Sequence, residues 1–112
     1  MDGKIEATKD HCYYCFEVLQ CKLKGKPIPK YPEHLEDHKL PIFVTWLFEG
    51  ELRGCIGTFS HEKLSSILAE YTLISALEDD RFDPIDLKEL EYLSVGVSFL
   101  VDFRPNQGPY DW

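Results

Sequence analysis

The residues best suited to chemistry lie in one stretch, Leu52–Phe59, whose sequence is LRGCIGTF. A thiol near a guanidinium can have a lowered pKa, which favours the nucleophilic thiolate. The planar guanidinium of Arg53 can also hold a carboxylate or a phosphate through two parallel hydrogen bonds. The stretch therefore points to two kinds of chemistry, nucleophilic attack by Cys55 or recognition of an anion by Arg53.

Two glycines in the same stretch favour a binding surface. Glycine inside a strand costs roughly 0.5–1 kcal/mol relative to alanine, and it usually marks a bulge or the close approach of another backbone or a ligand. Gly54 and Gly57 remove side chains on either side of Cys55, which would expose backbone N–H and C=O groups. We therefore predict a binding surface made by Arg53, Gly54, Cys55, Gly57 and Thr58, with the Thr58 hydroxyl at its rim.

Catalysis by Cys55 lacks an activating partner in the sequence. No histidine lies within the motif, and a lone cysteine in a strand is usually a small buried hydrophobe. We therefore expect Cys55 to be a poor nucleophile, and we assign no catalytic residue. For Arg53 a structural alternative stays open, in which its guanidinium stacks on Trp46 or pairs with Glu51.

The elements that position these residues begin with a helix and a hairpin. Apolar residues recur at helical spacing over Thr8–Lys24, which predicts a helix. Ile42–Phe48 is rich in aromatic and β-branched residues and predicts a strand that is covered on both faces. Glu49 and Gly50 supply a tight turn into a returning strand, Glu51–Phe59.

The hairpin also predicts which residues share a face. If the connection has two residues, Trp46 lies opposite Arg53 and Val44 lies opposite Cys55. Arg53, Cys55 and Trp46 would then project from the same face of the sheet. We therefore add Trp46 to the predicted binding surface.

The rest of the chain adds two helices and a strand. We expect Ser60 to be the N-cap of a helix that ends near Glu78, a short helix at about Leu87–Tyr92, and a strand over Ser94–Phe103 in which apolar and small residues alternate. The order α-β-β-α-α-β implies a mixed α/β (α+β) architecture, with a largely antiparallel sheet packed against helices. With 112 residues the chain forms one domain at most.

Composition narrows the classes of partner. Acidic residues outnumber basic ones by 20 to 12, and the net charge of −8 argues against general binding to nucleic acid. No segment approaches the roughly 18–20 apolar residues that cross a bilayer, and Met1–Asp10 lacks the apolar run of a secretory signal. We therefore predict an intracellular protein with no membrane partner, whose cysteines are thiols and whose partner is an unknown protein or small ligand.

The sequence does not predict a metal site or a cofactor. Cys12 and Cys15 form a C-x-x-C pair, but structural zinc needs about four ligands, and helical spacing turns Cys21 away from Cys12. The chain has no second C-x-x-C and no phosphate-binding glycine motif. Core packing is therefore the expected role of Cys12 and Cys15.

Several motifs across the chain resemble the AMMECR domain family. They are LRGCIGTF itself, CYYCFEVL from Cys12, LPIFVTW from Leu40, EYTLISAL from Glu70 and DRFDPI from Asp80. The resemblance runs from Cys12 to Trp112 and implies a single domain over residues 1–112 that is incomplete. The chain is similar to the first half of the family domain, cut at its C-terminal end.

The resemblance also adds residues to the predicted site. Glu70, Tyr71, Arg81 and Phe82 match further family positions, and they would form a secondary rim around the glycine-rich strand. The simpler alternative for Arg81 is a surface ion-pair cluster with neighbouring aspartates, in which each pair is worth about 0–1 kcal/mol.

Two functions stay open. The first is an interaction or regulatory module that binds a protein, a peptide or a small ligand at the LRGCIGT strand; the resemblance implies residence in the nucleus, the cytoplasm or both. The second is an enzyme or enzyme subunit that modifies nucleic acid or a small molecule, as the resemblance to microbial family members implies. A base or a metal ligand that converges on Cys55 and Arg53 would distinguish the enzyme from the module.

We predict that the 112-residue chain, expressed alone, is marginally stable, prone to aggregation or dependent on a partner. Leu73 and Leu77 lie away from the main apolar stripe of their predicted helix, and each large apolar side chain left in water forgoes roughly 1.5–3 kcal/mol of burial. Thermal melting measures the stability of the chain, and binding of a hydrophobic dye measures its exposed apolar surface. A monomer with one cooperative melt at high temperature and no dye binding would contradict it.

Overall fold

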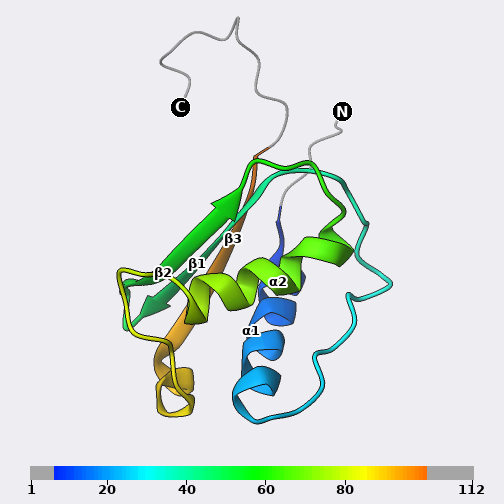
Figure 1. Cartoon of the computed structure of the whole chain (residues 1–112). Helices are drawn as coiled ribbons and strands as arrows, with labels where there is room; N and C mark the ends of the chain where they lie inside the picture. Colours follow the sequence, from blue (N-terminus) through cyan, green and yellow to red (C-terminus); the bar gives the residue numbers. More distant parts are fainter. Residues whose placement is uncertain (1–6, 101–112) are drawn as a thin grey trace, which may run out of the picture.

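The computed structural model describes residues 7–100, which form three helical segments and a three-stranded antiparallel sheet (Figure 1). The strands lie in the order β2-β1-β3. The predicted α+β class and order of elements are therefore confirmed. The elements are α1 (Lys9–Leu23), β1 (Ile42–Phe48), β2 (Glu51–Thr58), α2 (Leu64–Leu77), the 3-10 helix η1 (Leu87–Tyr92) and β3 (Leu93–Phe99).

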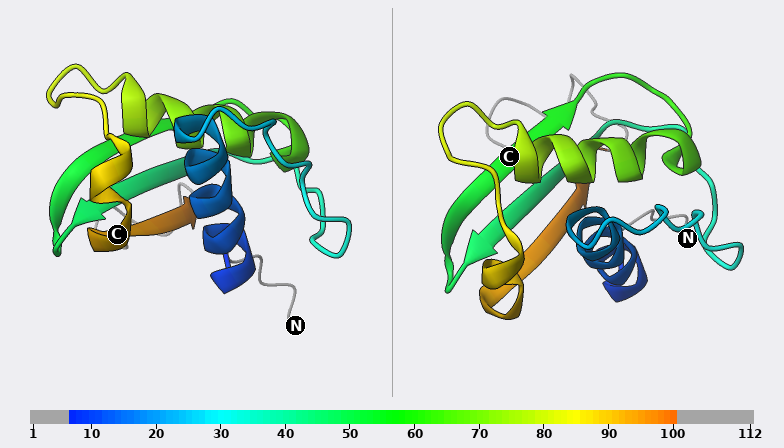
Figure 2. Two further views of the ribbon diagram at one scale, coloured as in Figure 1. Left: turned by 90° about the horizontal axis from the view of Figure 1, so that it is seen from below. Right: turned by 60° about the horizontal axis from the view of Figure 1, so that its bottom comes forward.

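The core lies between one face of the sheet and the helices α1 and α2 (Figure 2). Alternate residues of β1 point into this core, where Ile42, Val44 and Trp46 are fully buried. The indole N–H of Trp46 donates to the carbonyl of Thr72 in α2 at 3.2 Å, and its ring lies 6.0 Å from the ring of Phe16 in α1. Trp46 therefore joins the sheet to both helices with its single donor satisfied.

The first helix and the hairpin turn form where the sequence predicts them. Thr8 is the N-cap of α1, and its backbone N–H donates to Nδ1 of His11 at 2.9 Å. Glu49 and Gly50 have φ angles of 50° and 87°, the left-handed backbone that a two-residue hairpin turn requires. The predicted strand Ser94–Phe103 appears as β3, and its last three residues lie outside the described residues.

The second helix begins later than predicted. We expected Ser60 to be its N-cap, but α2 starts after Lys63, and the Ser60 N–H instead donates to the hydroxyl of Thr58 at 3.1 Å. The first turn of α2 is capped by Asp37, whose carboxylate accepts from the N–H of Ser65 at 3.0 Å. A carboxylate from the proline-rich loop therefore satisfies a donor that a local cap would otherwise satisfy.

The predicted hairpin register is wrong beyond the first two pairs, because β2 contains a bulge. Leu47 lies opposite Leu52 as expected, but Trp46 then lies opposite Gly54, which leaves Arg53 as an extra residue. Cys55 consequently pairs with Thr45. Since a shift of one residue exchanges the faces of a strand, Cys55 lies on the face opposite Trp46, and the predicted shared face is not formed.

The close approach of α2 explains this register. Gly54 is buried beneath α2, and a Cβ atom at this position would overlap the backbone carbonyl of Ser75. The bulge brings the residue without a side chain to the point where the helix backbone crosses the strand. Gly54 therefore reflects the approach of another backbone, which was one of the alternatives for a strand glycine.

The second face of the sheet bears no helix within residues 7–100 (Figure 2). It carries half-buried residues of β1 and small exposed residues of β3, namely Phe43, Thr45, Leu47, Ser94, Gly96 and Ser98. Leu73 and Leu77, which we expected to be uncovered, are instead partly buried against the core. The uncovered apolar surface is therefore on the sheet and not on α2.

We predict that Gly54→Ala destabilises the protein by about 1–3 kcal/mol, the usual cost of an overpacked core position. Gly96→Ala is the matched control, because a Cβ atom at Gly96 has no neighbour within 4 Å. Chemical denaturation of both variants measures the difference. Equal stability of the two variants would show that α2 does not require a glycine at position 54.

Candidate functional site

A turn after α2 closes the outer edge of β2 at Cys55. Oδ2 of Asp79 accepts from the backbone N–H of Cys55 at 3.0 Å, and Nη2 of Arg81 donates to the Cys55 carbonyl at 3.1 Å. The same Nη2 donates to Oδ2 of Asp79 at 2.7 Å, and Nε donates to Oδ1 at 3.0 Å. The two side chains, which we call the edge clamp, thus bond to Cys55 as a neighbouring strand would.

Electrostatics strengthens the edge clamp. Asp79 is 5% exposed, and hydrogen bonds from Arg81 and from the Cys55 N–H hold the pKa of its carboxyl well below the usual range. The hydrogen bonds to Asp79 likewise raise the pKa of Arg81. The predicted exposure of the Cys55 backbone for a ligand is therefore wrong, because both of its polar groups are already bonded.

Arg53 is held by a partner distant in sequence. Its Nε and Nη2 donate to the two carboxylate oxygens of Glu89 at 2.8 and 3.0 Å. Nη1 and Nη2 also donate to the carbonyls of Asp83 and Pro84 at 2.6 and 3.3 Å. These four bonds use most of the five guanidinium donors. Arg53 therefore has a structural partner, but that partner is Glu89, and neither the stacking on Trp46 nor the pairing with Glu51 that we considered is formed.

Glu89 is ionised and well placed for this contact. It lies in the first turn of η1, where its carboxylate also accepts from the N–H of Asp86 at 3.3 Å. The hydrogen bonds from Arg53 lower the pKa of Glu89. The pattern Asp86-x-x-Glu89 is a capping box that the sequence could have revealed, but it does not indicate the pairing with Arg53.

Cys55 projects toward a hydroxyl group. Its Sγ lies 3.1 Å from Oγ1 of Thr45, the residue opposite it on β1. A threonine hydroxyl is not a base that takes a proton from a thiol at neutral pH. The geometry described for Cys55 therefore does not supply the base that a nucleophilic mechanism requires.

A hollow of about 570 Å³ lies beside the bulge and brings three of the predicted site residues together, namely Arg53, Arg81 and Phe82. The guanidinium of Arg81 lies 5.4 Å from the centre of the Phe82 ring, within the range of a cation–π contact. The hollow combines two cations with three carboxylates and two aromatic rings. Its lining consists of Phe48, Arg53, Asp80, Arg81, Phe82, Asp83 and Glu89.

The other predicted site residues lie elsewhere. Trp46 and Gly54 are buried beneath the helices. Gly57 lies under the ring of Phe43, which occupies the space of a Cβ atom. Thr58 is half-buried at the end of β2, and Glu70 and Tyr71 lie on α2, exposed and half-buried respectively. The fold therefore does not bring the whole predicted surface together.

The described residues contain no cluster of three or more histidine, cysteine, aspartate or glutamate side chains that could hold a metal ion. Cys15 packs in the core, and burial raises the pKa of its thiol to about 12. Cys12 is half-buried at the edge of a groove beside β3. No helix in residues 7–100 has the length and apolar character needed to span a bilayer.

The chain is similar to several proteins of one family. A family model described as AMMECR1 matches residues 12–112. An uncharacterized protein of Schizosaccharomyces pombe is 38% identical over 93% of this chain and 56% of its own length. An uncharacterized protein of Arabidopsis thaliana is also 38% identical, over 96% of this chain and 52% of its own length.

One solved structure shares the fold. The crystal structure of an uncharacterized protein from Pyrococcus horikoshii superimposes with a TM-score of 0.70 and 27% sequence identity. The match covers 87% of this chain and 55% of that protein. The chain therefore spans about half the length of the relatives that it matches.

We predict that Asp79→Asn lowers stability at neutral pH and that its deficit shrinks in acid. The folded-state pKa of Asp79 lies below its unfolded value of 3.8. Ionised Asp79 therefore stabilises the fold fully above about pH 5, and this contribution is lost as the pH falls through the folded-state pKa. Urea unfolding at neutral and acidic pH measures the deficit. The control is Asp80→Asn at the exposed neighbour; a deficit independent of pH would exclude the ionised carboxylate as its source.

Proposed function

The chain belongs to the AMMECR1 family, and because the relatives named above are uncharacterized proteins, we propose its function from the geometry of its site. The protein is an interaction module, and its partner binds at the hollow lined by Arg53, Arg81 and Phe82. The observation that carries this proposal is the meeting of these three residues, which come from a strand and from a turn about 30 positions later.

The hollow has the side chains that protein interfaces favour. Arginine and aromatic residues are enriched among the residues that contribute most binding energy, and here Phe82 lies under the guanidinium of Arg81. The described hydrogen bonds of the Arg81 side chain come from Nε and Nη2. Its Nη1 group therefore has donors available for an acceptor on a partner.

The charges of the hollow favour a polypeptide over a polyanion. Three carboxylates, from Asp80, Asp83 and Glu89, surround the two arginines. A polyphosphate or nucleic acid would be repelled by this excess of negative charge and by the net charge of −8 of the whole protein. A peptide segment that offers both donors and acceptors matches the mixed charges, and an apolar side chain on it can pack against Phe48 and Phe82.

In this proposal the LRGCIGT strand supports the site and contributes only part of its surface. Arg53 reaches the hollow from the bulge, and the Cys55 backbone positions Arg81. An enzymatic function would require a base near Cys55, and the observed neighbour is the Thr45 hydroxyl. The module is therefore the function that these contacts support better.

Two broader features belong to the same proposal. An intracellular location, nuclear or cytoplasmic, rests on the family resemblance. The relatives are about twice as long as the matched region, so we propose that the chain is one part of the family domain and that the activity of the whole domain requires the other part.

We predict that Phe82→Ala reduces recovery of a specific partner at least about tenfold, because loss of one central aromatic contact commonly costs more than 1.4 kcal/mol. Quantitative capture from cell extract with the tagged chain measures this. Phe59→Ala is the matched control, because Phe59 is 76% exposed and is absent from the lining of the hollow.

The two variants distinguish binding at the hollow from binding on the second face of the sheet. Loss of a partner with Phe82→Ala alone supports the hollow, provided that circular dichroism shows an intact fold. Loss of the partner with Phe59→Ala alone would place binding on the second face of the sheet and would overturn the proposed location. Retention of every partner by both variants would also overturn it.

A further inference from the structure

The two edges of the sheet are treated differently by the fold. The outer edge of β2 is bonded at Cys55 by the edge clamp. The outer edge of β3 has no strand beside it within residues 7–100. Charged residues and proline on an edge strand usually prevent it from pairing with another strand. The β3 sequence, LSVGVSF, contains neither. Among the described residues no strand pairs with this edge, and the group that contacts its backbone is the thiol of Cys12, at Val97.

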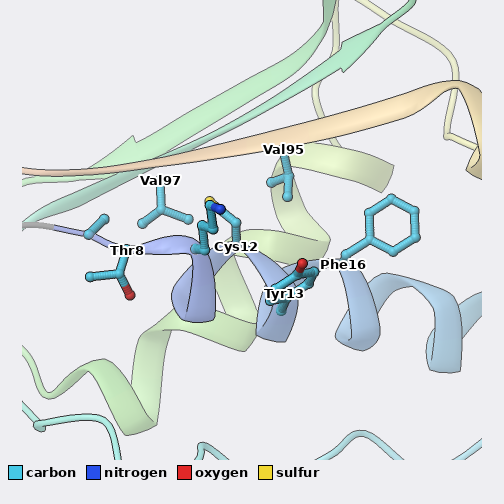
Figure 3. Close-up of a pocket in the computed structure, with 8 residues that line it drawn as sticks. Thr8, Cys12, Tyr13, Phe16, Val95 and Val97 are labelled. Atoms are coloured by element: carbon cyan, nitrogen blue, oxygen red, sulfur yellow. The ribbon is translucent and has the colours of Figure 1, made fainter.

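A groove lies beside this edge, between β3 and α1 (Figure 3). Val95 and Val97 extend from β3 toward α1, whose residues Cys12, Tyr13 and Phe16 form the other wall. The groove has a volume of about 680 Å³. Tyr13 is 70% exposed here, although it is a large aromatic residue on a helix that packs against the sheet. A backbone edge next to an apolar groove is the arrangement used for strand addition.

We propose that the β3 edge receives an added β-strand from the part of the AMMECR1 fold that this chain does not span. The length of the family proteins supports this occupant, because the matched region covers only 55% of the solved Pyrococcus horikoshii protein and 56% of the Schizosaccharomyces pombe protein. Each of these relatives therefore contains a comparable length of polypeptide outside the matched region.

The groove also defines the chemistry of the added strand. Side chains alternate between the two faces of a sheet, so one set would enter the groove against Val95 and Val97. The other set would lie beside Ser94, Gly96 and Ser98, which are exposed on the second face. The added strand therefore has apolar residues at alternate positions and small or polar residues between them.

A second copy of this chain fits the edge less well. Two copies paired through β3 about a two-fold axis would place their helices on the same side of the joined sheet. Since α1 forms one wall of the groove at this edge, the two α1 helices would compete for the space above the seam. A single strand without a helix at this position avoids that collision.

The test uses the unmatched remainder of the Schizosaccharomyces pombe relative as the probe, co-expressed with this chain. The positive control is the same remainder with the matched portion of that relative. We expect a complex in both cases, with hydrogen exchange of the outward amides of β3 slowed roughly tenfold or more. Alkylation of Cys12, mapped by mass spectrometry, should slow as well.

Variants locate the contact. Tyr13→Lys should weaken the complex roughly tenfold, because it places a charge in the groove at an exposed position that does not support the core. Ser66→Lys, an equal change in charge at an exposed position of α2, should have no effect. Unchanged exchange at β3 within a stable complex would overturn the proposal. It would also fall if neither portion bound the remainder, or if the chain alone formed a dimer that protects β3.

Discussion

The contact between the backbone of α2 and Gly54 is the constraint on which the rest of the structure depends. The helix crosses β2 so closely that a Cβ atom at this position has no room. Trp46 lies opposite Gly54 and bonds to Thr72 in the same helix. One glycine and one tryptophan thus set the position of α2 on the sheet, and the bulge at Arg53 follows from the need to keep both on the helix side.

The bulge determines where the functional groups of the signature go. Arg53, as the extra residue, reaches Glu89 and the carbonyls before η1. Cys55 turns to the second face, and its backbone at the sheet edge is bonded by Asp79 and Arg81. These contacts connect the turn after α2 to the edge strand. Much of the LRGCIGTF stretch therefore has an architectural role, and the hollow beside it is a product of that architecture.

The fold leaves two kinds of surface with different character. The hollow beside the bulge is polar and charged, and its side chains already bond to one another. The β3 strand has no charged residue, and the groove beside it is mainly apolar, with Lys9 as the charged residue of its lining. Charged groups at an interface contribute more to specificity and to the rate of association than to affinity, which suits reversible recognition. An open apolar edge is instead a surface that a folded protein normally covers.

The sequence by itself determined the elements, because their causes are local. Thr8 caps α1, Glu49 and Gly50 adopt the turn, and alternation of valine with small residues forms β3. It also determined the family, through motifs spread over most of the chain. Only the tertiary structure decided the register of β2, because the reason for the bulge is a helix backbone that packs on the strand from about 20 residues later. The same holds for the partners of Arg53 and of Cys55, which lie 36 and 24 residues away. Hydrogen bonds between residues so far apart in the sequence depend on how the helices and strands pack. The spacing of residues along the sequence does not predict that packing.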